Sequence, residues 1–248
     1  MLQALRTARG VWRSLRIYYG GRERRTAMDR FHAQFVKDGD LVFDIGAHVG
    51  DRVASFRRLG ARVIAVEPQP ALVATLRLIH GLDRHVRIEA MAVGAQNGQI
   101  DLRINIDNPT ISTASADFVN AARDADGWQG QHWERTIGVP VTTLDALIGK
   151  YGRPSFIKID VEGFEEEVLC GLSAAVPALS FEFTTIQRDV ARRCIARCVD
   201  LGYAQFNAAL GESQQFIAVE WRPAESLREW LDALPHDANS GDVYARPA

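Results

Sequence analysis

The sequence predicts an α/β fold built on a parallel β-sheet. Two observations predict it: short apolar runs rich in β-forming residues recur along the chain, and the segments that connect them have the apolar spacing of short helices. The chain has 248 residues, of which 47% are hydrophobic, and this suits one domain with a substantial core.

The first 38 residues are expected to form a basic helical extension ahead of a domain that spans residues 39–248. Residues 1–30 carry eight arginines and two acids, a net charge of +6 in a chain whose total is −2. An apolar stripe at helical spacing predicts a helix that packs on the core with its arginines in water. Contact with a membrane surface, or closure over a substrate, is the alternative. The stripe consists of Leu2, Leu5, Trp12, Leu15 and Tyr19.

Strands and helices are expected to alternate from residue 41 onward. Gly60 is a stop signal for the first helix, and Pro70 opens the second at a position where proline favours the first turn. Because the crossover connections are short helices, the strands that they join should be parallel. The expected order is strand 41–46, helix 51–60, strand 62–68, helix 70–79 and strand 86–93.

The pattern changes in the middle of the chain. Residues 99–106 alternate with period two, as a half-exposed strand does. The polar segment 107–136, which leads to the next apolar stretch at 137–148, is long for a connection inside a compact domain. We interpret it as an insertion that forms the wall of an acceptor site; a surface loop pinned by its tryptophans is the alternative. The candidate acceptor contacts are Ser112, Thr113, Trp128 and Trp133.

Alternation resumes towards the C-terminus. The expected elements are strand 155–160, helix 165–172, strand 178–184, helix 189–202, a hairpin of 203–210 with 214–221, helix 225–234 and a last or edge strand at 242–246. Cys194 and Cys198 lie four residues apart on one of these helices. We interpret them as small buried side chains, because no second Cys or His pair has the spacing of a metal site.

The stretch DIGAHVGD, residues 44–51, has the features of a ligand-binding loop. A strand that leads through glycines into a helix leaves free backbone N–H groups at the helix N-terminus, and Asp44 adds a negative charge. Gly46 permits a sharp turn and a close approach of a ligand to the backbone, and Gly50 lets the helix start near the sheet. The dinucleotide pattern G-x-G-x-x-G fails, because His48 and Asp51 replace its later glycines. An acid at the helix start would repel a pyrophosphate, so the loop favours a ligand without phosphate, such as S-adenosylmethionine.

Glu67 ends the second strand, at a position where an acid can accept hydrogen bonds from both ribose hydroxyls. A surface acid that caps the next helix is the alternative. His48 stands where the loop is expected to need a positive φ, which His, Asn and Asp tolerate better than most residues. Its imidazole either reaches the ligand or acceptor or only fills the turn.

The stretch IKIDVEG, residues 157–163, contains a second candidate site. Lys158 and Asp160 alternate on one side of a strand, and Asp160 and Glu162 lie at its carboxyl end, where ligands gather in an open parallel sheet. Buried charges are costly unless they are paired, so a structural ion pair is the alternative. Glu182 of the next strand could join the cluster. Three carboxylates without histidine are a weak metal signal, and we expect no metal ion.

These stretches together resemble the FkbM family of S-adenosylmethionine-dependent methyltransferases. The matching segments are LVFDIGAHVGDRVASFRRLGARVIAVEPQP, AVGAQNGQIDL, VPVTTLDALI and PSFIKIDVEGFEEEVLCGL, between about residues 40 and 184. The resemblance implies a class I methyltransferase fold: a doubly wound, mainly parallel seven-stranded sheet with helices on both faces.

The resemblance also assigns roles to individual residues. The cofactor S-adenosylmethionine is expected to contact Asp44, Gly46, Ala47, His48, Gly50, Glu67, Pro68, Ala92 and Asp160. The catalytic candidates are Asp160, Glu162, Lys158 and His48. The first three match the family signature K-x-D-x-E. His48 departs from the asparagine expected at its position.

The expected reaction is transfer of a methyl group to a hydroxyl of a sugar, a glycan or a polyketide-like small molecule. A hydroxyl is a poor nucleophile at neutral pH, so Asp160 or Glu162 is expected to act as general base, with His48 as the competitor. The alternatives are N-methylation, a nicotinamide-dependent oxidoreductase, a metal-assisted enzyme that uses Glu182 with the two acids, and a non-catalytic partner protein.

Charge and hydropathy limit the classes of binding partner that we expect. A net charge of −2 and a pI near 6.3 give no case for nucleic acid. No apolar run is long enough for a transmembrane span, although the N-terminal basic helix is suited to peripheral membrane contact. Three cysteines and the lack of a secretory signal pattern favour a cytoplasmic enzyme.

Overall fold

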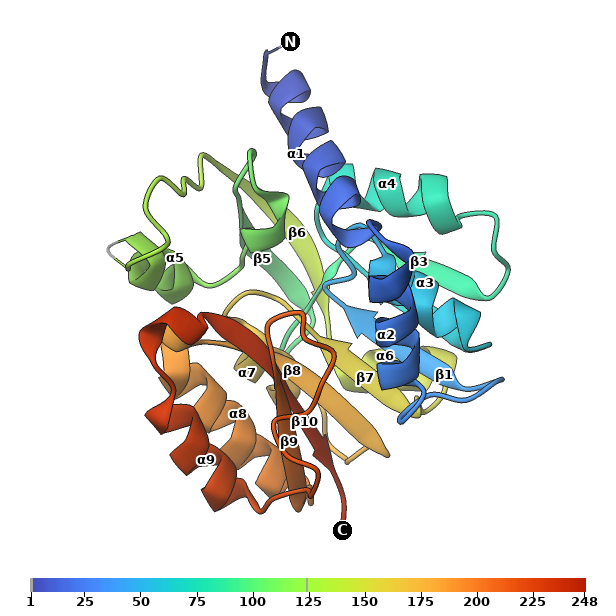
Figure 1. Cartoon of the computed structure of the whole chain (residues 1–248). Coiled ribbons are helices and arrows are strands. Elements are labelled where there is room, and N and C mark those ends of the chain that lie inside the picture. Colours follow the sequence, from blue (N-terminus) through green and yellow to red (C-terminus); the bar gives the residue numbers. More distant parts are fainter. Residues whose placement is uncertain (1, 124) are drawn as a thin grey trace.

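A seven-stranded β-sheet forms the centre of the molecule (Figure 1). The computed structural model describes residues 2–123 and 125–248. The first five neighbouring strands are parallel, and β10 is antiparallel to both of its neighbours, so the expected mainly parallel seven-stranded sheet is confirmed. In spatial order the strands are β3 (Val86–Glu89), β2 (Arg62–Val66), β1 (Leu41–Ile45), β7 (Phe156–Ile159), β8 (Ala178–Thr184), β10 (Ser240–Arg246) and β9 (Gln205–Leu210).

Helices cover both faces of this sheet, as expected for a doubly wound fold. Strand residues alternate between two cores: Phe43 and Ile45 pack against one set of helices, whereas Val42 packs against the other. The first set is α6 (Leu144–Tyr151), α7 (Glu165–Cys170), α8 (Arg188–Asp200) and α9 (Ala224–Ala233). The second set is α2 (Arg22–His32), α3 (Asp51–Arg58) and α4 (Pro70–His80). Local signals agree with these bounds, since Pro70 lies in the first turn of α4 and Thr143 caps α6.

A smaller three-stranded sheet lies beside the main one. Its strands are, in spatial order, β4 (Ala92–Val93), β6 (Arg135–Thr142) and β5 (Gly98–Ile104). The single strand expected at 86–93 is therefore wrong: the chain turns after Glu89, and Ala92 pairs with Val141 of β6 instead of continuing beside β2. The remaining short elements of the described chain are η1 (Pro109–Ile111), α5 (Ala116–Arg123), η2 (Thr185–Gln187) and η3 (His236–Ala238).

The prediction of a C-terminal hairpin between 203–210 and 214–221 is wrong. Residues 203–210 do contain a strand, β9, but its partner is β10, and 214–221 form no strand. The last strand is also not at an edge, because β10 lies between β8 and β9. Its residues are buried on both faces, Val243 in one core and Tyr244 in the other, which is why it can occupy an inner position.

The N-terminal helix α1 (Leu2–Tyr18) runs past α4 and extends beyond the rest of the molecule (Figure 1). The prediction that its apolar stripe packs on the core is partly wrong, because Leu5 and Trp12 are each 61% exposed. Gly10 and Ser14 are buried instead, and a Cβ at Gly10 would lie 2.8 Å from the carbonyl oxygen of Ile106, so only glycine allows this close packing. The side chain of Leu2 lies outside the described residues.

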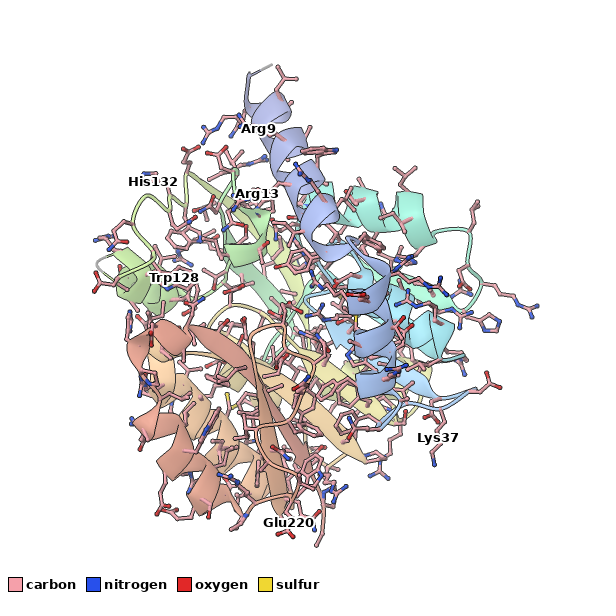
Figure 2. The ribbon with its side chains drawn as sticks, in the orientation of Figure 1. Arg9, Arg13, Lys37, Trp128, His132 and Glu220 are labelled. Atoms are coloured by element: carbon pink, nitrogen blue, oxygen red, sulfur yellow. The ribbon has the colours of Figure 1, made fainter. Side chains whose placement is uncertain are left out.

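The charged side chains of α1 include Arg9 and Arg13, which are exposed (Figure 2). Peripheral contact of this helix with a membrane stays a prediction. Among the described residues, no helix has the length and hydrophobicity that crossing a bilayer requires.

Candidate active site

A row of polar side chains crosses one face of the central sheet. Asp44 of β1 is in register with Lys158 of β7, which is in register with Ser180 of β8 and then Tyr244 of β10. All four are buried among residues that are otherwise apolar. Because the parallel strands β7 and β8 end at the same edge, their next polar residues meet beyond this row, at the carboxyl end of β7. The antiparallel strand β10 adds Asp242 there, in register with Glu182.

A cavity of about 300 Å³ opens at this edge of the sheet. It is lined by the loops that follow β1, β2 and β7, by the ends of β8 and β10, and by the segment around η1. The predicted site residues that line it are Gly46, Ala47, His48, Glu67, Pro68, Ala92, Lys158, Asp160 and Glu162. Stretches far apart in the sequence thus contribute to one cavity.

Asp44 and Gly50, two predicted cofactor contacts, do not line the cavity. Asp44 is 1% exposed, and its Oδ2 has no hydrogen-bond partner in the described chain. Burial raises the pKa of Asp44 to about 7, although the neighbouring charge of Lys158 opposes the shift. Gly50 has φ 85° at the N-cap of α3, where a Cβ would lie 2.7 Å from Leu76 and 2.8 Å from His80. It therefore lets α3 start against α4.

The loop after β1 is held in place by its contact with the turn after β7. Gly46 has φ 84°, and a Cβ there would overlap with the carbonyl oxygen of Asp160. The N–H of Asp160 in turn donates to the carbonyl of Ile45, at 2.9 Å. The absence of a side chain at Gly46 thus serves the approach of a second loop, whereas the sequence suggested the approach of a ligand.

His48 adopts φ 50°, the positive value expected for it. Its backbone N–H donates to Glu67, while its ring lies edge-on to Tyr18 with centroids 5.1 Å apart. The Nε2 atom is 3.4 Å from the hydroxyl of Thr110. Burial lowers the pKa of His48 to about 4, so the ring is neutral at physiological pH.

Glu67 is buried, so it is not the surface acid of the alternative interpretation, but its carboxyl group does accept the backbone N–H of the N-cap residue of α4. Its Oε2 accepts the N–H of His48 at 3.0 Å, and its Oε1 accepts the N–H of Gln69, the N-cap residue of α4, at 2.8 Å. Burial raises the pKa of Glu67 to about 8, although these two hydrogen bonds oppose the shift. Each oxygen keeps a further lone pair, and the residue lines the cavity, which fits a ligand that presents two hydroxyls.

The lining near Glu67 fits an adenosyl group without phosphates. Met91, Ala92 and Val93 offer apolar contacts, and Phe164 lines the cavity with them. The acid Asp51 also lines it, at the N-terminus of α3. A helix N-terminus that carries an acid disfavours a pyrophosphate and suits a ligand with a cationic sulfonium.

Acids gather at the carboxyl end of β7. Oxygen atoms of Asp160, Glu162 and Glu182 lie within 4.8 Å of one another. Lys158 Nζ donates to Asp160 Oδ2 at 2.6 Å and lies 3.9 Å from Asp242 Oδ1. Burial opposes ionisation of Asp160, but the Lys158 charge and hydrogen bond outweigh it and lower the pKa of this carboxyl.

The other acids of the cluster shift in the opposite direction. Burial, followed by the charge of Asp160, raises the pKa values of both Glu162 and Glu182 well above the usual range. Glu162 also has a positive φ of 56°. The cluster therefore holds one acid that loses its proton more easily than usual beside two that hold theirs more tightly than usual.

The segment 107–136 contributes one wall of the cavity. Ser112 and Trp128 line it, and Trp128 lies beside α5, with its ring edge-on to Phe118 (Figure 2). Thr113 and Trp133 instead hold the segment in place: the hydroxyl of Thr113 donates to the carbonyl of Glu162 at 2.6 Å, and Trp133 Nε1 donates to that of Ile111 at 2.7 Å.

Several lining residues were not anticipated from the sequence. Tyr18 comes from the N-terminal helix, and Arg52, Glu212 and Asp242 come from three distant segments. Asp242 had a detectable signal, because an acid inside an apolar strand is costly in the same way as Lys158. Arg52 and Glu212 had none, because they pair across 160 positions of sequence.

Comparisons with known proteins identify a family and one curated relative. The family model for the methyltransferase FkbM domain matches residues 44–235. Hexuronic acid methyltransferase AglP of Haloferax volcanii is 27% identical over 156 residues, which cover 62% of this chain and 59% of that protein. The alignment therefore spans less than two thirds of this relative.

Two solved structures are also similar to the chain. A TehB-like SAM-dependent methyltransferase from Corynebacterium glutamicum has 12% sequence identity and a TM-score of 0.47, with coverage of 96% of this chain and 94% of that one. Fibrillarin of Aeropyrum pernix, in complex with S-adenosyl-L-methionine, has 13% identity and a TM-score of 0.45, with coverage of 85% and 68%.

Proposed function

Because the chain belongs to the FkbM family of S-adenosylmethionine-dependent methyltransferases, we propose that it methylates a hydroxyl group of a sugar or glycan. Membership of this family excludes the alternative functions of an oxidoreductase and a non-catalytic partner protein, since the chain is a methyltransferase. That the acceptor is a sugar is supported by the relative AglP, which is named for methylation of a hexuronic acid.

One observation carries the proposal: the acids at the end of β7 and the loop after β1 line the same cavity. We assign Glu67, Pro68 and Ala92 to the adenosine part of the cofactor. They line the cavity together with Gly46 and Ala47 of the loop after β1. Asp160 and Glu162 line the cavity at the turn that contacts this loop. An acceptor bound beside them would be close to the cofactor's reactive end.

The cofactor supplies an activated methyl group, so the protein's task is to position the acceptor and to take up its proton. Glu162 is our candidate for the base, because its raised pKa makes its ionised form a stronger base than an ordinary carboxylate. Lys158 keeps Asp160 ionised, and the negative charge of Asp160 strengthens the basicity of Glu162. Lys158 is thus a positioning residue.

His48 is the weaker candidate for the base. Its lowered pKa, about 4, makes the imidazole a poor proton acceptor, and its Nε2 lies near Thr110 at 3.4 Å. We assign His48 to the wall of the cavity, where its φ of 50° completes the loop and its N–H fixes Glu67.

The test is methyl transfer from labelled S-adenosylmethionine to a panel of sugars and glycan extracts, with the product analysed by mass spectrometry. The proposal predicts label on a sugar oxygen. Label only on nitrogen, or on acceptors without a sugar, would contradict it. Binding of S-adenosylhomocysteine, measured on the same sample, shows that the protein is folded and has a working cofactor site.

A further inference from the structure

The cavity wall formed by β7, β8 and β10 is acidic. Asp160, Glu162, Glu182 and Asp242 all line it, and Glu182 and Asp242 are direct neighbours because they pair in the register of β8 and β10. Glu212 adds a further carboxylate to the lining. This wall lies on the side of the cavity away from Glu67, where the acceptor is expected.

The basic side chains of the cavity are already paired. Arg52 and Lys158 are the arginine and lysine among its described lining residues. Arg52 donates to Asp51 at 2.5 Å and to both oxygens of Glu212 at 2.7 Å. Lys158 is 2.6 Å from Asp160 and 4% exposed. Neither cation is left over for a carboxylate of a ligand.

Several acidic oxygens, in contrast, have no donor. Glu182 Oε2 and Asp242 Oδ1 are buried without a hydrogen-bond partner in the described chain. Glu162, which is 6% exposed, lines the cavity beside them. Buried polar atoms without partners are costly, so these oxygens mark a position for a group that donates hydrogen bonds.

We propose that the sugar acceptor carries a protonated amino group, which Glu182 and Asp242 bind, and that the cavity excludes sugars that carry a carboxylate. An ammonium group supplies three hydrogen-bond donors to oxygens that have none, and it adds a positive charge to that of Lys158, which lies 3.9 Å from Asp242 Oδ1 and is already paired with Asp160. A carboxylate would meet like charges without a free cation to neutralise it. This inference rests on the proposed sugar methylation, and it separates the chain from the relative named for a hexuronic acid.

The raised pKa values of Glu182 and Asp242, which burial causes, agree with this assignment. In the free protein these carboxyl groups hold their protons more tightly than usual, although the charge of Lys158 opposes the shift at Asp242. Binding of an ammonium group would release those protons, whereas binding of a carboxylate would require that they stay. Preference for the amino sugar over an acidic sugar should therefore increase as the pH rises, as long as the amine remains protonated.

Binding of three sugars of the same ring size tests the proposal: glucosamine, glucose and glucuronate, titrated into the full chain saturated with S-adenosylhomocysteine. At a pH at which the amine is protonated, glucosamine should bind on the order of ten-fold more tightly than glucose, and glucuronate more weakly than both. Equal affinity for glucuronate and glucosamine, or binding of none of the three, would overturn the proposal. So would tight binding of magnesium ions that competes with glucosamine, because the acids would then form a metal site.

The variants Glu182→Gln and Asp242→Asn should each remove the preference for glucosamine over glucose. The matched control is Glu225→Gln, an exposed acid on α9, which should keep the preference. Methyl transfer to the same sugars separates this inference from the proposed function. Methylation of glucuronate as fast as of glucosamine would overturn the inference alone, whereas binding of glucosamine without methylation of any sugar would overturn the function alone.

Discussion

The carbonyl oxygen of Asp160 occupies the space that a Cβ atom would need at Gly46. Two loops that are far apart in the sequence, one after β1 and one after β7, are therefore in direct backbone contact. One of these loops carries the expected cofactor contacts, and the other carries the acids. Their contact determines the distance between the two halves of the site.

Gly46→Ala should disturb both stability and cofactor binding, because the methyl group can only be accommodated if the loops separate. Gly39→Ala is a matched control: Gly39 also has a positive φ, 82°, but a Cβ there has no neighbour within 4 Å. The control should lose about 1–2 kcal/mol of unfolding free energy from backbone strain alone. We expect Gly46→Ala to lose more than this in urea denaturation, and to bind S-adenosylhomocysteine at least ~10-fold more weakly. Equal losses in both variants would show that the loop contact is unimportant.

Asp44 should make the stability of the ligand-free protein depend on pH. Its native pKa, about 7, exceeds that of the unfolded chain, so the native state holds a proton that the unfolded state has already released. The free energy of unfolding should therefore fall as the pH rises from about 4 to about 7.

Asp44→Asn should remove this contribution, which is on the order of 1 kcal/mol per pH unit. Thermal melts of the variant and the parent protein should agree best near pH 4 and diverge towards pH 7 and above, with the variant more stable relative to its parent at the higher pH. Asp101→Asn, at an exposed position of β5, is the control and should follow the parent. A parallel pH dependence of Asp44→Asn and the parent would refute the assignment.

The sequence was sufficient to predict the parts of the site that lie on adjacent elements. The stretches around Asp44 and Lys158 become neighbouring strands, so their local patterns predict both the sheet and the acids at its edge. The positive φ of His48 followed from its place in a glycine loop. In each case the informative residues are close in sequence to the strand that positions them.

Other parts of the site depend on contacts that no local pattern encodes. The strand β10 enters the sheet between β8 and β9, and only this insertion brings Asp242 beside Glu182. Tyr18 reaches the cavity because α1 packs against α4 and η1 through the small residue Gly10 rather than through its apolar stripe. Tertiary packing decided both outcomes.

Glu162→Gln should lower kcat by about 10²- to 10⁴-fold, the usual contribution of a general base. The affinity for S-adenosylhomocysteine should not change, because the variant keeps the size of the side chain. Glu167→Gln, on an exposed position of the adjacent helix α7, is the matched control. If Glu162→Gln keeps its turnover and His48→Asn loses it, the base is His48.

Trp128→Ala should raise KM for the acceptor about five- to ten-fold, as expected for loss of an aromatic contact of about 1 kcal/mol. The cofactor affinity should be unaffected, because Trp128 lies on the segment 107–136 and not in the loop after β1. Trp12→Ala, at a position that is 61% exposed on α1, is the control. An acceptor KM that is the same in both variants would show that the segment does not form the acceptor wall.

The central claim is that the adenosyl cofactor lies between the loop after β1 and Glu67. Calorimetric titration of S-adenosylhomocysteine into the parent protein and into Glu67→Gln tests it most directly, with Glu225→Gln as the control. The account predicts binding to the parent and the control, and on the order of ten-fold weaker binding to Glu67→Gln above pH 8, where Glu67 is ionised and two charge-assisted hydrogen bonds to the ribose become neutral ones. Unchanged affinity in Glu67→Gln, or binding of a pyridine dinucleotide in place of S-adenosylhomocysteine, would contradict it.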